Sequence, residues 1–170
     1  LDENGRPAGY SVDLTRAIAQ EMGLDIEIRL GPWAEILRDL DEGRIDILQG
    51  MFYSPERDLK YDFTQPHAFN HYVAIVRKGE EPAPSSIQGL ARKRIVAQRG
   101  DAICLELEKN GLGDRISLVE TQEDALRELA EGKHDCAVGV RISSLYLIEK
   151  NGWSNLELGR KPLASMEYCY

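Results

Sequence analysis

The loop at residues 49–57, with the sequence QGMFYSPER, has the residue types and spacing of an anion-binding site. It follows an apolar segment, and Ser54 with the proline after it is typical of a helix start. Arg57 then lies one turn into that helix, close to the carboxyl end of a strand. A guanidinium there can bind a carboxylate through two parallel hydrogen bonds. The alternative is that Arg57 pairs with Glu56 or Asp58 on the surface.

Motifs of catalysis and of cofactor binding are absent from the sequence. It contains no GxGxxG after a strand, no GK[ST] phosphate loop, no GxSxG elbow and no HExxH. His134 is expected on a surface turn, whereas His67 and His71 are expected near a loop where either could contact a polar ligand. Because the three histidines share no metal-ligand spacing, we expect neither a metal site nor a cofactor.

The cysteines and the overall composition exclude several classes of protein. The chain has 170 residues, 42% hydrophobic and 29% charged, which is typical of a globular protein. A net charge of -8 without a basic cluster argues against a nucleic-acid partner. No apolar run approaches the roughly 20 residues that span a bilayer. The three cysteines are Cys104, Cys136 and Cys169. Because their number is odd and none forms a CxxC motif, we expect small buried hydrophobic side chains, and one disulfide within the second half of the chain remains the alternative.

Helical and strand patterns alternate along the chain. The 3.6-residue period, caps and glycine stops predict helices at 11–22 (capped by Ser11 and ended by Gly23), 33–40, 101–109, 121–129 and 142–150. Alternating or short apolar runs predict strands at 25–30, 45–48, 71–77, 95–98, 116–119, 135–140 and 156–158.

A repeated turn indicates two similar units. The segment LDEGRID at residues 40–46 parallels LAEGKHD at residues 129–135, and both lead from a helix through a glycine into an apolar strand. The Pro-rich polar stretch at 79–86 lies between the two copies. The sequence therefore predicts an α/β fold of two lobes with mainly parallel strands and a ligand-binding cleft between them.

The order of several short motifs resembles the bacterial extracellular solute-binding proteins of family 3. These motifs, in chain order, are GYSVDL at 9–14, LDEGRID at 40–46, SPER at 54–57, DFTQP at 62–66, QRG at 98–100 and GKHDCAV at 132–138. The resemblance implies the two-lobed type II periplasmic-binding-protein fold, with lobes at 1–77 and 86–165, a linker at 78–85 and a return strand at 166–170. It also implies that the family's first strand precedes Leu1 and that the end of the first lobe follows Tyr170.

The resemblance assigns ligand-binding roles to several positions. Arg57 matches the arginine that binds the ligand carboxylate, and Trp33 matches an aromatic residue that packs on the ligand, although a tryptophan at a helix start can equally belong to the core. Gln49 and Gly50 match positions that line the site. Gly100 belongs to the turn that opens the helix at 101–109.

The chain departs from the family pattern at three of these positions. Phe52 replaces a hydroxyl residue that bonds the carboxylate, and Asp101 replaces the Thr or Ser at the helix N-terminus. Val140 replaces the acidic residue that pairs with the α-amino group. A carboxylate would be opposed by Asp101, and an ammonium would lack its counter-ion at Val140. These changes favour a small organic or aromatic acid, or another polar metabolite, over a standard α-amino acid bound in the usual way; the absence of any ligand is the remaining alternative.

The expected function is that of a non-enzymatic sensor domain of a bacterial receptor, most simply a sensor histidine kinase. Such a domain lies outside the cytoplasm, reaches the membrane only through the rest of its protein, can form a homodimer, and closes about a hinge of two strands near 76–79 and 166–170. The alternative is a periplasmic carrier for an amino-acid or organic-acid ABC transporter. A dehydratase activity comes third, because the sequence shows no convincing acid–base pair.

Overall fold

The computed structural model describes residues 4–170 as helices packed on one sheet. The helices are α1 (Tyr10–Met22), α2 (Trp33–Asp41), α3 (Pro55–Asp58), α4 (Ala102–Lys109), α5 (Gln122–Ala130) and α6 (Arg141–Asn151), with 3-10 turns η1 (Ile87–Leu90) and η2 (Gly113–Arg115). The strands are β1 (Met51–Phe52), β2 (Ala68–Arg77), β3 (Ile95–Gln98), β4 (Ile116–Val119), β5 (Cys136–Val140), β6 (Leu156–Leu158) and β7 (Ala164–Cys169). No helix within residues 4–170 has the length and apolar character needed to cross a membrane.

Strand β2 organises the sheet, whose order is β1-β7-β2-β5-β3-β4 with β6 also paired to β2. One edge of β2 pairs antiparallel with β7 at residues 68–72 and with β6 at residues 75–77. Its other edge pairs antiparallel with β5 at residues 72–75. Parallel pairs join β3 only to β4 and β5 among the described strands. The expected α/β fold is confirmed, but its strands are not mainly parallel: the sheet is mixed, because β2 pairs antiparallel with β5, β6 and β7.

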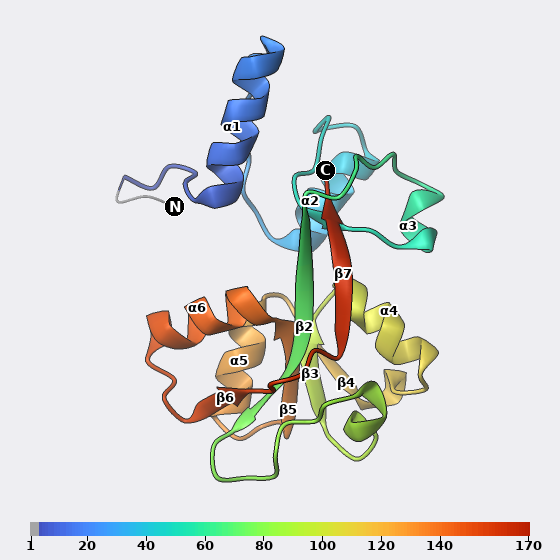
Figure 1. Cartoon of the computed structure of the whole chain (residues 1–170), viewed down its shortest axis with the longest axis vertical. Coiled ribbons are helices and arrows are strands. Elements are labelled where there is room, and N and C mark those ends of the chain that lie inside the picture. The colour runs from blue at the N-terminus through green and yellow to red at the C-terminus, as the bar shows by residue number, and fades with distance from the viewer. Residues whose placement is uncertain (1–3) are drawn as a thin grey trace.

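The two faces of the sheet carry separate parts of the core. Side chains alternate along a strand, so Tyr72 and Ala74 pack on one face together with α4, whereas Val73 and Ile75 pack on the other face together with α5. Figure 1 shows α4 on one side of the sheet and α5 and α6 on the other. The three cysteines are buried and free, which agrees with their interpretation as small buried hydrophobes.

Figure 1 also shows α1, α2 and α3 at one end of the molecule, with β2 and β7 extending from them into the sheet that α4, α5 and α6 cover. The helices at that end bury little: α1 buries Val12 and Ala19, and α2 buries no residue fully. Most of the described core is therefore built by β2 and the elements that follow it.

Two predicted strands are wrong. Residues 25–30 and 45–48 have no strand structure, although Leu48 is buried. A strand exists only where a neighbouring backbone accepts and donates its hydrogen bonds, and no described segment pairs with either stretch. Ser11 is also not the cap of the first helix, because that helix begins at Tyr10 with Gly9 in the cap position.

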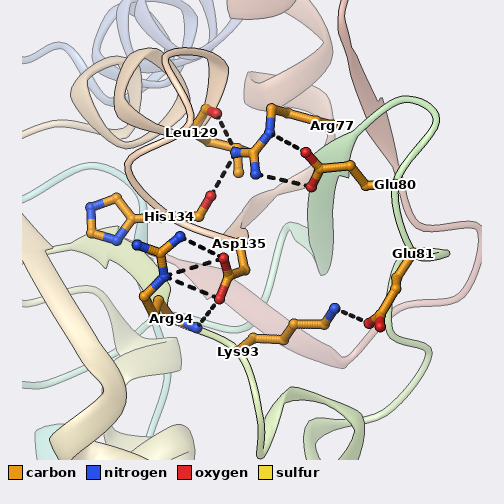
Figure 2. Close-up of polar contacts among 8 residues, drawn as sticks. All are labelled: Arg77, Glu80, Glu81, Lys93, Arg94, Leu129, His134 and Asp135. Atoms are coloured by element: carbon orange, nitrogen blue, oxygen red, sulfur yellow. Dashed lines mark hydrogen bonds and ion pairs between the residues drawn. The ribbon is translucent and has the colours of Figure 1, made fainter.

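The second copy of the repeated turn is held by charged side chains at the end of the sheet remote from α1 (Figure 2). The backbone N–H of Arg94 donates to Oδ2 of Asp135 at 2.9 Å, and its Nη2 donates to Oδ1 at 2.7 Å. These bonds hold the pKa of Asp135 at about 2. Asp135 thus joins the start of β5 to the start of β3.

The partly buried guanidinium of Arg77 holds the neighbouring helix end. Its Nη1 donates to the carbonyl of Leu129 at 2.8 Å and to that of His134 at 2.6 Å, and its Nε contacts Glu80 at 2.8 Å (Figure 2). Carbonyls at the end of a helix lack partners within the helix, so Arg77 satisfies an end of α5. Because Glu81 also pairs with Lys93, the segment 78–85 is attached to this remote end of the sheet.

We predict that Arg77→Met lowers the free energy of unfolding by about 1–3 kcal/mol, because it removes the side-chain donor to the carbonyl of His134 and one of the two donors to that of Leu129. Urea unfolding followed by circular dichroism measures the change. Arg92→Met is the matched control, since Arg92 is exposed on the same surface. Equal midpoints for the two variants would contradict the role of Arg77.

Candidate functional site

A cavity of about 170 Å³ lies where the end of the molecule that carries α2 and α3 meets the strand ends of the sheet. It collects the carboxyl ends of β3 and β5 and the starts of α4, α5 and α6, which is where open α/β sheets bind ligands. The lining residues are Trp33, Gly50, Phe52, Arg57, Asn70, Gln98, Asp101, Gln122, Val140, Ser143 and Tyr168.

Arg57 is positioned as its local sequence predicts. The side chain of Ser54 accepts a hydrogen bond from the Arg57 backbone N–H at 3.3 Å and caps α3. The guanidinium donates to the carbonyl of Phe52 at 2.8 Å and to that of Gly100 at 3.1 Å. Burial lowers its pKa while the nearby Asp101 raises it, and an arginine stays charged in either case. The cavity wall therefore contains a fixed cation.

The alternative pairing of Arg57 with its acidic neighbours is not observed. Glu56 instead contacts Nζ of Lys109 on α4 at 2.6 Å, which lowers the pKa of Glu56 to about 2. Asp58 accepts a hydrogen bond from the hydroxyl of Tyr53 at 3.4 Å. Arg57 consequently faces the cavity, while Glu56 links α3 to α4 outside it.

Trp33 lies beside Arg57 and does not belong to the buried core. Its Nε1 donates to the carbonyl of Gly100 at 3.1 Å, and the Arg57 guanidinium lies 5.6 Å from the centre of its ring. One carbonyl therefore accepts from both side chains. Gly100 has a φ of 73°, and a Cβ there would lie 3.3 Å from the indole. Gly100 therefore lies directly against Trp33, although it is not itself among the lining residues.

Gln49 and Gly50 have different positions. The Gln49 side chain points away from the cavity and donates to the carbonyl of Ser11 at 2.6 Å and to the hydroxyl of Tyr170 at 3.2 Å. Gly50 lines the cavity with a φ of 84°, and a Cβ there would lie 2.1 Å from the hydroxyl oxygen of Tyr168. The absence of a side chain at Gly50 makes room for that tyrosine.

Asp101 occupies the cap position of α4 without a side-chain cap hydrogen bond. Its Oδ1 accepts a hydrogen bond from the hydroxyl of Tyr72, a fully buried residue. Burial raises the pKa of Asp101, and its hydrogen bond with Tyr72, the backbone amides of Ala102 and Ile103 and the charge of Arg57 lower it. The pKa of Tyr72 lies well above its usual range because the ring is buried beside a carboxylate. The tyrosine therefore remains a donor at neutral pH.

Sequence reasoning missed several lining residues. Gln98 and Gln122 could have been found, because they stand at the end of a strand and the start of a helix that the sequence placed correctly. Asn70 and Tyr168 gave no such signal, because only the pairing of β2 with β7 brings them to the cavity. The missed residues are Asn70, Gln98, Gln122, Ser143 and Tyr168.

None of the histidines lines the cavity. His71 contacts the hydroxyl of Ser165 at 2.7 Å, and the ring of His67 contacts those of Tyr168 and Tyr170. His134 is not a surface residue as expected, since its side chain is 12% exposed and contacts Glu128 at 2.9 Å. Over residues 4–170, no three His, Cys, Asp or Glu side chains are arranged to hold a metal ion.

Comparison with known proteins connects this geometry to a family. The sequence profile of the family described as bacterial extracellular solute-binding proteins, family 3, matches residues 1–132. The probable amino-acid-binding protein YxeM of Bacillus subtilis is 27% identical over 99% of this chain and 64% of its own length. The L-cystine-binding protein TcyJ of Escherichia coli is 26% identical over 87% of this chain and 56% of its own length.

A solved structure gives a further comparison. A histidine kinase sensor domain with similarity to periplasmic binding proteins superposes with a TM-score of 0.94 and 38% identity, over 99% of this chain and 73% of that one. The chain thus has the same fold as that sensor domain, and it spans less than two thirds of the length of YxeM and TcyJ.

We predict that Gly50→Ala destabilises the protein by about 1–3 kcal/mol more than Gly79→Ala, because the new methyl group overlaps the Tyr168 side chain. The control shares the backbone strain, since Gly79 has a φ of 82°, but a Cβ there meets nothing within 4 Å. Thermal unfolding of both variants measures the difference. Identical losses would show that the contact with Tyr168 is unimportant.

Proposed function

The chain belongs to the bacterial extracellular solute-binding proteins of family 3, and from this premise we propose that it is the ligand-binding sensor domain of a bacterial receptor. Its fold is the type II periplasmic-binding-protein fold, and proteins of this family bind solutes without transforming them. Support for a sensor comes from the histidine kinase sensor domain, which is 38% identical, whereas YxeM and TcyJ are 27% and 26% identical. A histidine kinase module is the output that this similarity suggests.

The ligand proposed is a small, polar, anionic molecule that binds in the cavity. The observation that carries this proposal is the guanidinium of Arg57, which is held by two carbonyls and still has further N–H groups to donate to a carboxylate. Trp33 and Phe52 offer aromatic surface beside it. Phe52 cannot supply the hydroxyl group that other family members have at its position, so the arginine carries the anion recognition.

Hinge closure is the proposed mechanism of response. We place the hinge where β2 and β7 pair, at residues 68–72 and 164–168, because these segments connect the end that carries α2 and α3 to the rest of the sheet. The sequence put the first hinge strand at 76–79, next to the linker at 78–85. A ligand that contacts Arg57 and the start of α4 together favours closure only by its higher affinity for the closed form.

In the proposed receptor this domain lies outside the cytoplasm and is anchored to the inner membrane by another part of the protein. Closure would be transmitted through that anchor, and a second copy of the domain is the simplest partner for transmission. The partner outside the receptor is a small molecule rather than a nucleic acid, which agrees with the net charge of -8.

A periplasmic carrier of an ABC transporter is the alternative. It is favoured by the described functions of YxeM and TcyJ, which are amino-acid-binding and L-cystine-binding proteins. Because the chain spans only part of those relatives, the rest of its protein decides between the two roles.

We predict that Arg57→Ala removes the thermal stabilisation that carboxylic acids give the native domain, because the variant lacks the cation. Differential scanning fluorimetry with millimolar acids provides the measurement. Arg38→Ala is the control, since Arg38 is exposed on α2 and does not line the cavity. An acid that stabilises wild type and Arg57→Ala equally would refute the assignment.

The complete reading frame tests the sensor role. We expect a membrane-spanning segment followed by a signalling module after this domain. A frame that ends soon after the solute-binding domain, with a signal peptide before it, would establish the carrier and contradict the sensor.

A further inference from the structure

Two charged side chains of opposite sign line the cavity, and both belong to its described wall. Arg57 comes from α3 and Asp101 from the residue before α4. The charge of Asp101 raises the pKa of Arg57, and the charge of Arg57 lowers the pKa of Asp101. The two side chains nevertheless form no direct ion pair in the described part of the chain. The remaining lining groups are neutral, so a ligand that contacts both side chains meets a positive and a negative group.

The carboxylate of Asp101 lines the cavity and is held by polar groups on its protein side. Oδ1 accepts from Tyr72, whose ring is fully buried. The backbone amides of Ala102 and Ile103 at the start of α4 also face this carboxylate and lower its pKa. Because Tyr72 packs in the core against Phe52, its hydroxyl fixes the orientation of the carboxylate. Tyr72 is therefore a positioning residue, and Asp101 is the group that can accept a further hydrogen bond.

We propose that Asp101 determines which acids bind, because its carboxylate lines the cavity together with Arg57 and accepts a hydrogen bond from a hydroxyl or ammonium group of a ligand whose own carboxylate binds Arg57. This inference rests on the proposed function, since it assumes that Arg57 binds the anionic end. It narrows the ligand to a monocarboxylate with a neighbouring donor group. Hydroxy acids and amino acids share this chemistry, whereas unsubstituted dicarboxylates such as malonate have a second carboxylate and no donor group.

The surroundings of Asp101 explain why a second carboxylate is rejected. The first amides of α4 and the helix dipole would favour an anion, but the charge of Asp101 opposes one at that helix end. Like charges brought together in a partly enclosed site are strongly unfavourable. Val140 supplies no charge of its own, so an ammonium group has Asp101 as its only counter-ion in the described lining.

The test is a matched panel of propionate, lactate, alanine and malonate, which differ in the group that accompanies one carboxylate. Isothermal titration of the native domain measures each dissociation constant. We expect lactate and alanine to bind at least about tenfold more tightly than malonate, with propionate between them. Ethylamine serves as a probe that has the donor but no carboxylate.

Asp101→Asn is the matched variant, because it keeps the size and one acceptor oxygen but removes the charge. We expect malonate to bind more tightly and alanine more weakly, while lactate changes little. Near-ultraviolet circular dichroism checks that the variant is folded, and the order of affinities in wild type tests the inference without any variant.

The outcomes separate this inference from the proposed function. If malonate binds as tightly as alanine and lactate, and Asp101→Asn leaves the order unchanged, the role of Asp101 is wrong while the carboxylate site at Arg57 stands. If ethylamine binds as tightly as alanine and Arg57→Ala changes neither, the anion site is wrong while Asp101 stands. If none of the probes binds, both are wrong.

Discussion

The structure depends on the backbone pairing of β2 along both of its edges. Its central residues are almost completely buried, and a buried strand must satisfy its N–H and C=O groups through neighbouring strands. The pairs with β7, β6 and β5 do so, and they fix the two faces of the sheet. The same strand carries Asn70, Tyr72 and Arg77 at fixed distances from one another. Asn70 lies in the cavity, Tyr72 donates to Asp101, and Arg77 contacts the end of α5.

The cavity combines side chains of two origins around the carbonyl of Gly100. Trp33 and Arg57 reach it from α2 and α3, and both donate a hydrogen bond to this one acceptor at the turn before α4. A change in the relative position of the two sides must alter these bonds. The same geometry that places a cation in the cavity can therefore couple its occupancy to closure.

Membership of the solute-binding family accounts for the presence of the cavity but not for its selectivity. In our proposal Arg57 takes the role of the family arginine, whereas Phe52, Asp101 and Val140 line the same cavity with groups that differ from the family pattern. The structure shows Asp101 with a buried tyrosine as its partner, instead of a helix cap. This orientation is the basis of the selectivity that we propose for the cavity.

Local sequence determined the elements whose signals are local. The caps at Ser54 and Thr121, the stop at Gly23 and the strands at 95–98, 116–119 and 156–158 agree with the structure, and the QGMFYSPER loop was sufficient to single out Arg57. Tertiary structure alone decided the rest: residues 25–30 and 45–48 have no pairing partner, and Asn70 and Tyr168 reach the cavity only through the register of β2 with β7. The physical reason is that caps and periodicity involve residues within one or two turns, whereas strand pairing and cavity walls depend on contacts between distant segments.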